Sequence, residues 1–210
     1  MNTAALFEYS KYRTANRLAL AALTIATLAT ATSLTEADKQ KGLAQLDRTR
    51  SGVIEATKGL SESQWKFKPG PDRWSVAEVL EHIVIVEEFL LQNTSQNVMK
   101  ASAGKPDRDY TKTDELVLSA IADRTKKAQA PEPTLPTSRW PPQEALDRFL
   151  KARERTIEFL KSTPDLRDHV ADSPALRQPL DAYQWVLYAH SERHTKQILE
   201  VKAHPDFPKQ

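Results

Sequence analysis

Apolar residues recur at intervals of three and four along the last part of the chain, from 181 to 203, and this period predicts an amphipathic helix. The face that we expect to be buried carries these residues: Tyr183, Val186, His190, His194, Ile198 and Val201. Positions four apart lie on the same side of a helix, so two histidines interrupt an apolar stripe. A buried imidazole without hydrogen-bond partners costs about 1–3 kcal/mol. The pattern therefore predicts that His190 and His194 bind something inside the fold.

The clearest helix start in the sequence is Ser75-Val-Ala-Glu78, a capping box in which the serine and glutamate side chains satisfy backbone N–H groups. The helix that it opens is expected to continue to about residue 100, with His82 on or beside its apolar stripe. A helix rises about 1.5 Å per residue, so His82 comes level with the other two histidines if the two helices run antiparallel. We therefore expect three imidazoles to converge.

Two more long helices are predicted. A sparse apolar stripe begins after Thr35, a candidate cap, and favours a helix to about residue 60. Another follows the proline pair at 141–142, since proline suits a first helical turn, and it is expected to end near residue 162. The segments 61–74 and 163–179 contain proline and are expected to be connections without helix.

The long segment between the second and third helices is expected to cross the bundle. Residues 113–127 favour a short extra helix, and five prolines between Ala130 and Pro142 favour a stiff, extended chain. Such a connection gives the chain room to return, so that the second and third helices can run parallel. The pattern predicts an all-α fold, a four-helix bundle with a long middle crossover.

Composition agrees with helices: the 210 residues include only five glycines, and 28% of the residues are charged. This length suits one domain, which we place at residues 34–208. Before it, Lys11, Arg13 and Arg17 precede an apolar run that ends in Ala29-Thr30-Ala31, the layout of a cleaved signal peptide over residues 1–31. The alternative is a short N-terminal extension from a misplaced start.

The charge balance argues against a nucleic-acid partner. Residues 1–31 hold three basic residues and one acidic residue, so the chain's 30 basic and 28 acidic residues fall to 27 of each without them. A neutral chain gives no sign of a polyanion partner. The apolar run is shorter than the roughly 20 residues that a membrane span needs, so no stable span is expected after leader removal. The chain would then be periplasmic or secreted, and otherwise cytoplasmic.

The absence of cysteine restricts the chemistry. It rules out disulfides, a thiolate nucleophile and thiolate metal ligands, so a metal must be held by nitrogen and oxygen. The histidines His82, His190 and His194 suit a divalent ion such as Zn(II), Ni(II) or Fe(II) and leave a coordination position open. Hydrogen-bonded core histidines, or histidines in metal-free acid–base chemistry, are the alternatives.

Other polar residues near the histidines have simpler explanations. Glu192 stands two residues after His190, unlike the glutamate of the H-E-x-x-H protease motif, and is expected to be a solvated carboxylate. The capping box already explains Glu78. Arg193 and Gln197 could orient a ligand or water, but single polar residues at such positions are more often structural.

Two remaining histidines and the tryptophans are not expected to belong to the site. His169 and His204 lie in loop or terminal segments and are interpreted as surface residues. The tryptophans Trp65, Trp74 and Trp185 are interpreted as core anchors.

Two segments of the chain carry a recognisable pattern: Arg73-Trp-Ser-Val-Ala-Glu-Val-Leu-Glu-His82, and the stretch from Leu180 to Gln197, which contains His190-Ser-Glu-Arg-His194. Together they resemble the DinB/YfiT-like superfamily of metalloenzymes. The resemblance implies an up-down-down-up bundle with a divalent metal on His82, His190 and His194. It also implies that some relatives are transferases or isomerases that use low-molecular-weight thiols.

Whether the predicted leader directs export decides which reaction the sequence favours. Low-molecular-weight thiols are cytoplasmic, so an exported protein favours a metal-dependent hydrolase of a small substrate, in which the metal activates water. A thiol S-transferase or isomerase is the alternative for a cytoplasmic protein. A third, non-enzymatic hypothesis is a structural or vestigial metal site in a bundle that acts through partners or as a homodimer.

Overall fold

The computed structural model describes residues 33–104 and 108–209 of the chain. These residues belong to one compact unit, Ala31–Gln210. The leader predicted at residues 1–31 lies outside the described residues, so cleavage, export and the domain bounds remain predictions. None of the described helices is both long and apolar enough to cross a membrane.

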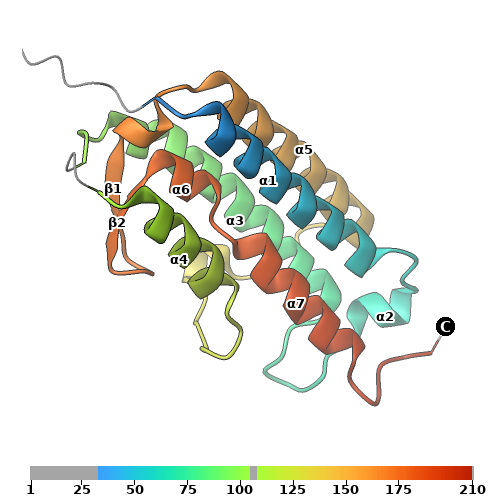
Figure 1. Cartoon of the computed structure of the whole chain (residues 1–210). Helices are drawn as coiled ribbons and strands as arrows, with labels where there is room; N and C mark the ends of the chain where they lie inside the picture. The colour runs from blue at the N-terminus through green and yellow to red at the C-terminus, as the bar shows by residue number, and fades with distance from the viewer. Residues whose placement is uncertain (1–32, 105–107, 210) are drawn as a thin grey trace, which may run out of the picture. The chain divides into compact units, whose positions relative to one another are not determined.

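Four long helices lie side by side in Figure 1 and form the bundle. They are α1 (Glu36–Thr57), α3 (Val76–Gln96), α5 (Pro142–Ser162) and α7 (His190–Lys202). The α5 bounds agree closely with the sequence prediction, whereas α1 ends at Thr57 and α3 at Gln96, each a few residues early. A short 3₁₀ turn, η1 (Val98–Lys100), continues α3 to its predicted end.

Side-chain contacts give the helix directions. Helices α1 and α7 run parallel, since Arg48 bonds to Glu192 and, further along both helices, Lys202 bonds to the carbonyl of Ala56. Helices α3 and α5 are also parallel, because their first halves share one core cluster and their second halves belong to the other. The start of α3 meets the end of α1 in the first of these clusters, so the two pairs run in opposite directions. The order is up-down-down-up, as predicted.

The core has two hydrophobic clusters at the two ends of the bundle. One cluster contains the following buried residues of the four long helices: Val53, Ala56, Val76, Val79, Leu80, Ile83, Val84, Ala145, Phe149, Ile198 and Val201. The other is built mainly around the segment before α7, with Tyr183, Leu180 and Leu160 almost fully buried. Because burial of an aliphatic or aromatic side chain contributes about 1.5–3 kcal/mol, these clusters are the main source of stability.

Predicted caps are present at the helix starts. Ser75 and Glu78 form the expected capping box of α3, which fixes where the helix begins and so where His82 stands. The Thr35 hydroxyl accepts from the Asp38 N–H at the start of α1. The connection 61–74 was predicted to lack helix, but it contains α2 (Glu62–Lys66), which Ser61 caps with Gln64 in a second capping box.

The prediction of one continuous last helix from Asp181 was wrong, because two helices, α6 (Ala182–Val186) and α7, occupy this part of the chain. Asp181 caps α6, and the chain turns before α7 begins at His190. No proline or glycine marks the break. Residues 182–187 are all buried, which a straight helix with a single buried face cannot achieve. Tertiary packing therefore overrides the helical period here.

The loop predicted at 163–179 was also wrong, because it holds the short 3₁₀ turn η3 (Leu166–Asp168) and a β-hairpin. Strand β1 (Val170–Ser173) pairs antiparallel with β2 (Gln178–Asp181), in the register Val170 with Asp181 and Ser173 with Gln178. Four-residue strands are too short to show the alternation that signals a strand.

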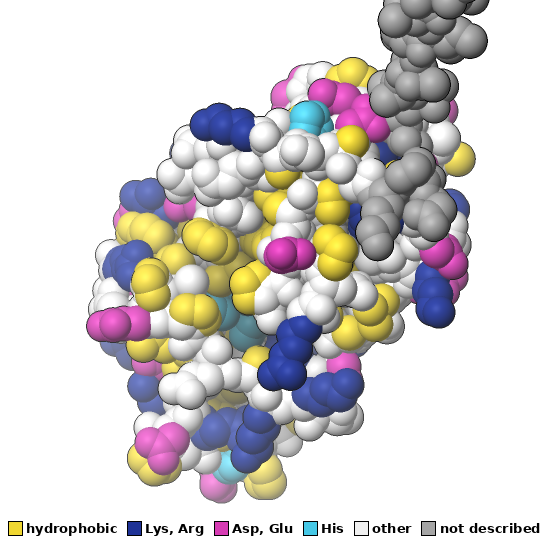
Figure 2. Space-filling model, turned by 90° about the vertical axis from the view of Figure 1, so that its left-hand side faces the viewer, with side chains coloured by type: hydrophobic (Ala, Val, Ile, Leu, Met, Phe, Trp, Pro, Cys, Tyr) yellow, Lys and Arg dark blue, Asp and Glu magenta, His cyan; other side chains and the backbone are white. Residues whose placement is uncertain are grey.

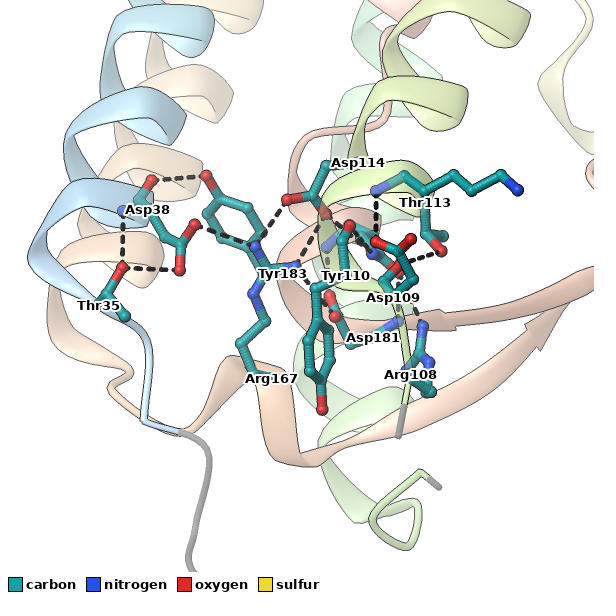
Figure 3. A network of polar contacts seen from close by, with 12 residues as sticks. Thr35, Asp38, Arg108, Asp109, Tyr110, Thr113, Asp114, Arg167, Asp181 and Tyr183 are labelled. Carbon is teal, nitrogen blue, oxygen red and sulfur yellow. Dashed lines mark hydrogen bonds and ion pairs between the residues drawn. The ribbon is translucent and has the colours of Figure 1, made fainter. Parts of the chain in front are cut away.

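The crossover carries α4 (Tyr110–Ala122), which begins and ends earlier than the predicted 113–127, and the short 3₁₀ turn η2 (Glu132–Thr134). A buried arginine fastens α4 to the rest of the chain, as Figure 3 shows. Arg167 bonds to Asp114 of α4, to Asp181 and to Asp38 of α1. This network fixes the first turns of α4 against the end of the bundle.

Candidate metal centre

The structure brings the three predicted histidines together. His82 comes from the second turn of α3, His190 is the first residue of α7, and His194 lies one turn further along α7. One nitrogen from each ring lies within 4.8 Å of the other two. His190 Nε2 and His82 Nε2 are 3.0 Å apart. The antiparallel packing of α3 and α7, which the sequence analysis assumed, produces this convergence.

The orientation of His82 is fixed from outside the cluster. Its Nδ1 lies 2.7 Å from the carbonyl oxygen of Thr134 in η2. A carbonyl only accepts hydrogen bonds, so Nδ1 carries the proton and the neutral ring keeps a lone pair on Nε2. Metal-binding histidines are held in this way by a partner on the other nitrogen. The crossover therefore turns the lone pair of His82 towards the cluster.

Burial keeps the three rings neutral. The exposed fraction is 3% for His82 and 7% for His194, whereas His190 is partly exposed. Desolvation lowers the pKa of His82, lowers the pKa of His194 to about 3, and, with the two neighbouring histidines, lowers the pKa of His190 well below its usual value. Neutral imidazoles are the form that binds metal.

The spacing and chemistry of the cluster fit a divalent ion. Two nitrogens bound to one zinc ion at about 2.0–2.1 Å in tetrahedral geometry are about 3.4 Å apart. The separations here, from 3.0 Å up to 4.8 Å, lie around that value. No carboxylate of the described residues joins the group, so a metal would meet three nitrogens and retain an open position.

An aromatic ring covers part of the cluster. The ring of Trp74, just before the cap of α3, lies 4.9 Å from the ring of His82 and is stacked at 6.4 Å from that of His194. Trp74 thus does more than the core packing that the sequence suggested, because its ring also helps to keep the imidazoles from water. Figure 2 shows a hollow with histidine at its floor and hydrophobic side chains around it.

The carboxylates that the sequence analysis set aside are indeed engaged elsewhere. Glu78 accepts from the Ser75 N–H and pairs with Lys68, which keeps the glutamate in its capping role. Glu192 pairs with Arg48 and Lys196 on the surface of the bundle. Neither glutamate belongs to the group of side chains that gather at the histidine cluster.

The two polar residues beside the pair differ in role. Arg193 donates to the carbonyls of Ile121, Asp123 and Lys126, and so it holds the C-terminal end of α4. Gln197, by contrast, lies 2.7 Å from Nδ1 of His194 through its side-chain oxygen.

The other two histidines are apart from the cluster. His169 bonds to the Ala101 carbonyl and to Asp165, and His204 packs against Phe67. Sequence reasoning had no signal for Thr134 or Arg124, which contact the site from the crossover.

Comparison with known proteins shows what the chain is similar to. Residues 45–198 match the family model of the DinB superfamily. The uncharacterised protein YuaE of Bacillus subtilis (strain 168) is 28% identical over 149 residues, which cover 69% of this chain and 87% of YuaE. The structure of YfiT from Bacillus subtilis, described as "a probable metal-dependent hydrolase with an unusual four-helix bundle topology", matches with a TM-score of 0.51 and 15% identity, over 81% of this chain and 89% of YfiT. At that identity the YfiT match bears on the fold.

Proposed function

The chain belongs to the DinB superfamily, and from this premise we propose that it binds a divalent metal ion through His82, His190 and His194 and hydrolyses a small substrate. The observation that carries the proposal is the orientation of the rings. His82 and His194 each bond outward through Nδ1, which leaves their Nε2 atoms for a shared ligand. YfiT, which has a similar fold, is itself described as a probable metal-dependent hydrolase.

The protein's own residues prepare the site in three ways. The Thr134 carbonyl holds the proton of His82 on Nδ1, away from the cluster. Trp74 shields the rings, and burial keeps them neutral. In the metal-free protein, His190 Nε2–H can donate to the lone pair of His82 Nε2 at 3.0 Å, so metal binding has to move that proton.

A divalent ion in this position supplies Lewis-acid chemistry, since it polarises an oxygen ligand and lowers the pKa of coordinated water towards about 7. The hollow in Figure 2 gives a small molecule an approach to histidine at its floor. The hydrophobic side chains around that hollow favour a substrate with an apolar part.

The first test is the metal content of the full chain, purified without an affinity tag and measured by elemental analysis. We expect close to one equivalent of zinc, nickel or iron in the wild type and almost none after His82→Ala with His190→Ala. His204→Ala is the matched control, because it removes a histidine far from the cluster and should leave the metal content unchanged. Failure of the wild type to bind any of these ions when they are offered would contradict the proposal.

The second test separates the reactions. The metal-loaded protein is assayed with small ester, amide and phosphoester substrates, with and without an added low-molecular-weight thiol. Hydrolysis that needs the metal but no thiol supports the proposal. Turnover only with thiol would favour the transferase alternative, and metal binding without any turnover would favour a structural site.

A further inference from the structure

The side chain of Gln197 connects His194 to the crossover. Its oxygen Oε1 lies 2.7 Å from His194 Nδ1, and the same oxygen accepts from Arg124 Nη1 at 3.3 Å. Arg124 follows α4 closely, whereas Gln197 and His194 belong to α7. The Gln197 oxygen therefore contacts both His194, a candidate metal ligand, and Arg124, which lies outside the four long helices.

The arginine determines which end of the amide faces the histidine. An arginine only donates, so the amide atom that it contacts must be the oxygen. That oxygen cannot donate to His194, and so His194 Nδ1 must carry the proton. The lone pair of the neutral ring is then on Nε2, towards His82 and His190.

Arg124 is itself firmly placed. Its Nε and Nη2 donate to the two carboxylate oxygens of Glu200 at 3.0 and 2.7 Å, a paired geometry that fixes the guanidinium plane. Its neighbours reinforce the contact, since Lys196 donates to the Ala122 carbonyl and Arg193 to carbonyls near the end of α4. The position of Arg124 therefore depends on α4 being seated on α7.

We propose that Gln197 and Arg124 act as a positioning pair, which holds His194 in the tautomer whose Nε2 lone pair faces the cluster. The seating of α4 on α7 then completes the metal site. This inference deepens the proposed function and rests on it for the role of His194 as a ligand. A purely structural role for the pair, in packing α4 against α7, makes a different prediction, because packing alone leaves the tautomer of His194 unchanged.

The test reads the tautomer directly in the metal-free full chain. Imidazole ¹⁵N chemical shifts distinguish protonated from unprotonated ring nitrogens at a pH where the histidines are neutral. We expect the Nδ1–H form of His194 in the wild type and a shift to the Nε2–H form in Gln197→Leu, which has no acceptor. Gln197→Glu keeps an acceptor oxygen and should preserve the Nδ1–H form. An unchanged tautomer in a folded Gln197→Leu would overturn the inference.

Zinc affinity provides the second measurement. Loss of the residue that orients a metal-binding histidine weakens metal affinity about 10–100-fold, which is the decrease expected for Gln197→Leu. Arg124→Met should produce a smaller decrease in the same direction. Lys196→Met is the matched control, because the Lys196 side chain also joins α7 to α4 but bonds to the Ala122 carbonyl and Glu192 instead of the Gln197 oxygen. The zinc affinity of this variant should equal that of the wild type.

The two proposals fail in different ways. If the wild type binds no zinc while the tautomer of His194 depends on Gln197, the positioning pair stands and the metal proposal falls. If the wild type binds zinc and Lys196→Met weakens binding as much as Arg124→Met, the positioning role is overturned, since general loosening of α4 would explain both.

Discussion

Two buried polar clusters lie close together along α3, and they differ in how their polar atoms are satisfied. The first is the histidine cluster. The second, the Arg153–Glu87 cluster, has members on all four long helices: Leu46 and Thr49 of α1, Glu87 of α3, Arg153 and Thr156 of α5, and Ser191 of α7. Ser191 follows His190 directly, so both clusters share the start of α7.

The Arg153–Glu87 cluster is complete within the protein. The guanidinium of Arg153 donates to both oxygens of Glu87 at 2.7 and 2.8 Å and also to the Leu46 carbonyl, Thr49 and Ser191. Such a network has no capacity left for a ligand, and it fixes the relative positions of the four helices.

The histidine cluster has the opposite character. Its outward nitrogens on His82 and His194 have protein partners, whereas the inward ones face one another. The inward nitrogens of His82 and His194 are acceptors, and acceptors cannot satisfy one another. The only donor that the cluster itself can supply is the Nε2–H of His190. The comparison indicates that burial alone does not distinguish the two clusters. The unsatisfied inward side of the histidine cluster does, and it is the feature on which the proposed metal site depends.

The largest effect is expected from removing one of the candidate metal ligands in the histidine cluster. His190→Ala should weaken zinc binding by more than about 100-fold, because loss of a direct ligand should exceed the effect of losing an orienting residue. Competition with a chromophoric chelator measures the affinity. Equal losses from His190→Ala and His204→Ala would contradict the difference drawn between the cluster and the other histidines.

The next largest effect is expected from disrupting the Arg153–Glu87 cluster. Arg153→Met leaves the carboxylate of Glu87 buried without its cation and should lower the free energy of unfolding by about 3–5 kcal/mol. Urea denaturation of the metal-free protein measures it. Arg155→Met is the matched control, since the Arg155–Glu88 pair next to it is exposed and should contribute about 1 kcal/mol or less. Similar losses from the two variants would show that the buried network has no special role.

A third prediction uses the pH dependence of stability to test whether the rings of the histidine cluster are neutral. The pKa values of His82, His190 and His194 are lowered by burial in the folded state, so below about pH 6.5 these three rings bind more protons in the unfolded chain than in the folded one. The metal-free protein should therefore lose stability as pH falls from about 6.5 towards 3, by up to about 1.4 kcal/mol per pH unit for each ring that stays neutral.

The variant His190→Ala with His194→Ala is the control for this slope. Asp181, whose pKa burial raises to about 6, contributes in the opposite direction, since the folded state then holds its proton more tightly. Both proteins contain Asp181, so its contribution cancels in the difference between them. Urea denaturation at pH 7, 6, 5 and 4 should show the steeper loss in the wild type, and parallel curves would contradict the neutral, buried state of the rings.

The smallest expected effect concerns the helix start that precedes His82. Ser75→Ala removes the cap of α3 and should lower the free energy of unfolding by about 1 kcal/mol. Zinc affinity should change by only a few-fold, because the Thr134 carbonyl still holds the ring of His82. Thr35→Ala, which removes the cap of α1 and lies away from the site, should cost a similar amount without changing affinity.

The sequence by itself determined the features that depend on local physics. Helical periodicity located the four long helices, and Ser75 with Glu78 marked the start of α3 because a capping box involves neighbouring residues. The prolines of the crossover predicted a long connection that lets the second and third helices run parallel, and the full up-down-down-up order came from the family resemblance. Histidines on apolar stripes identified the residues that converge, although their role as metal ligands stays a prediction.

Tertiary structure alone decided the break before His190, the β-hairpin, and the partners that orient the rings. His82 meets the Thr134 carbonyl 52 residues away, and Gln197 meets Arg124 73 residues away. Periodicity and capping motifs describe neighbours along the chain, so they carry no information on such pairs. The break has the same origin, because only packing on several sides can bury six consecutive residues at 182–187.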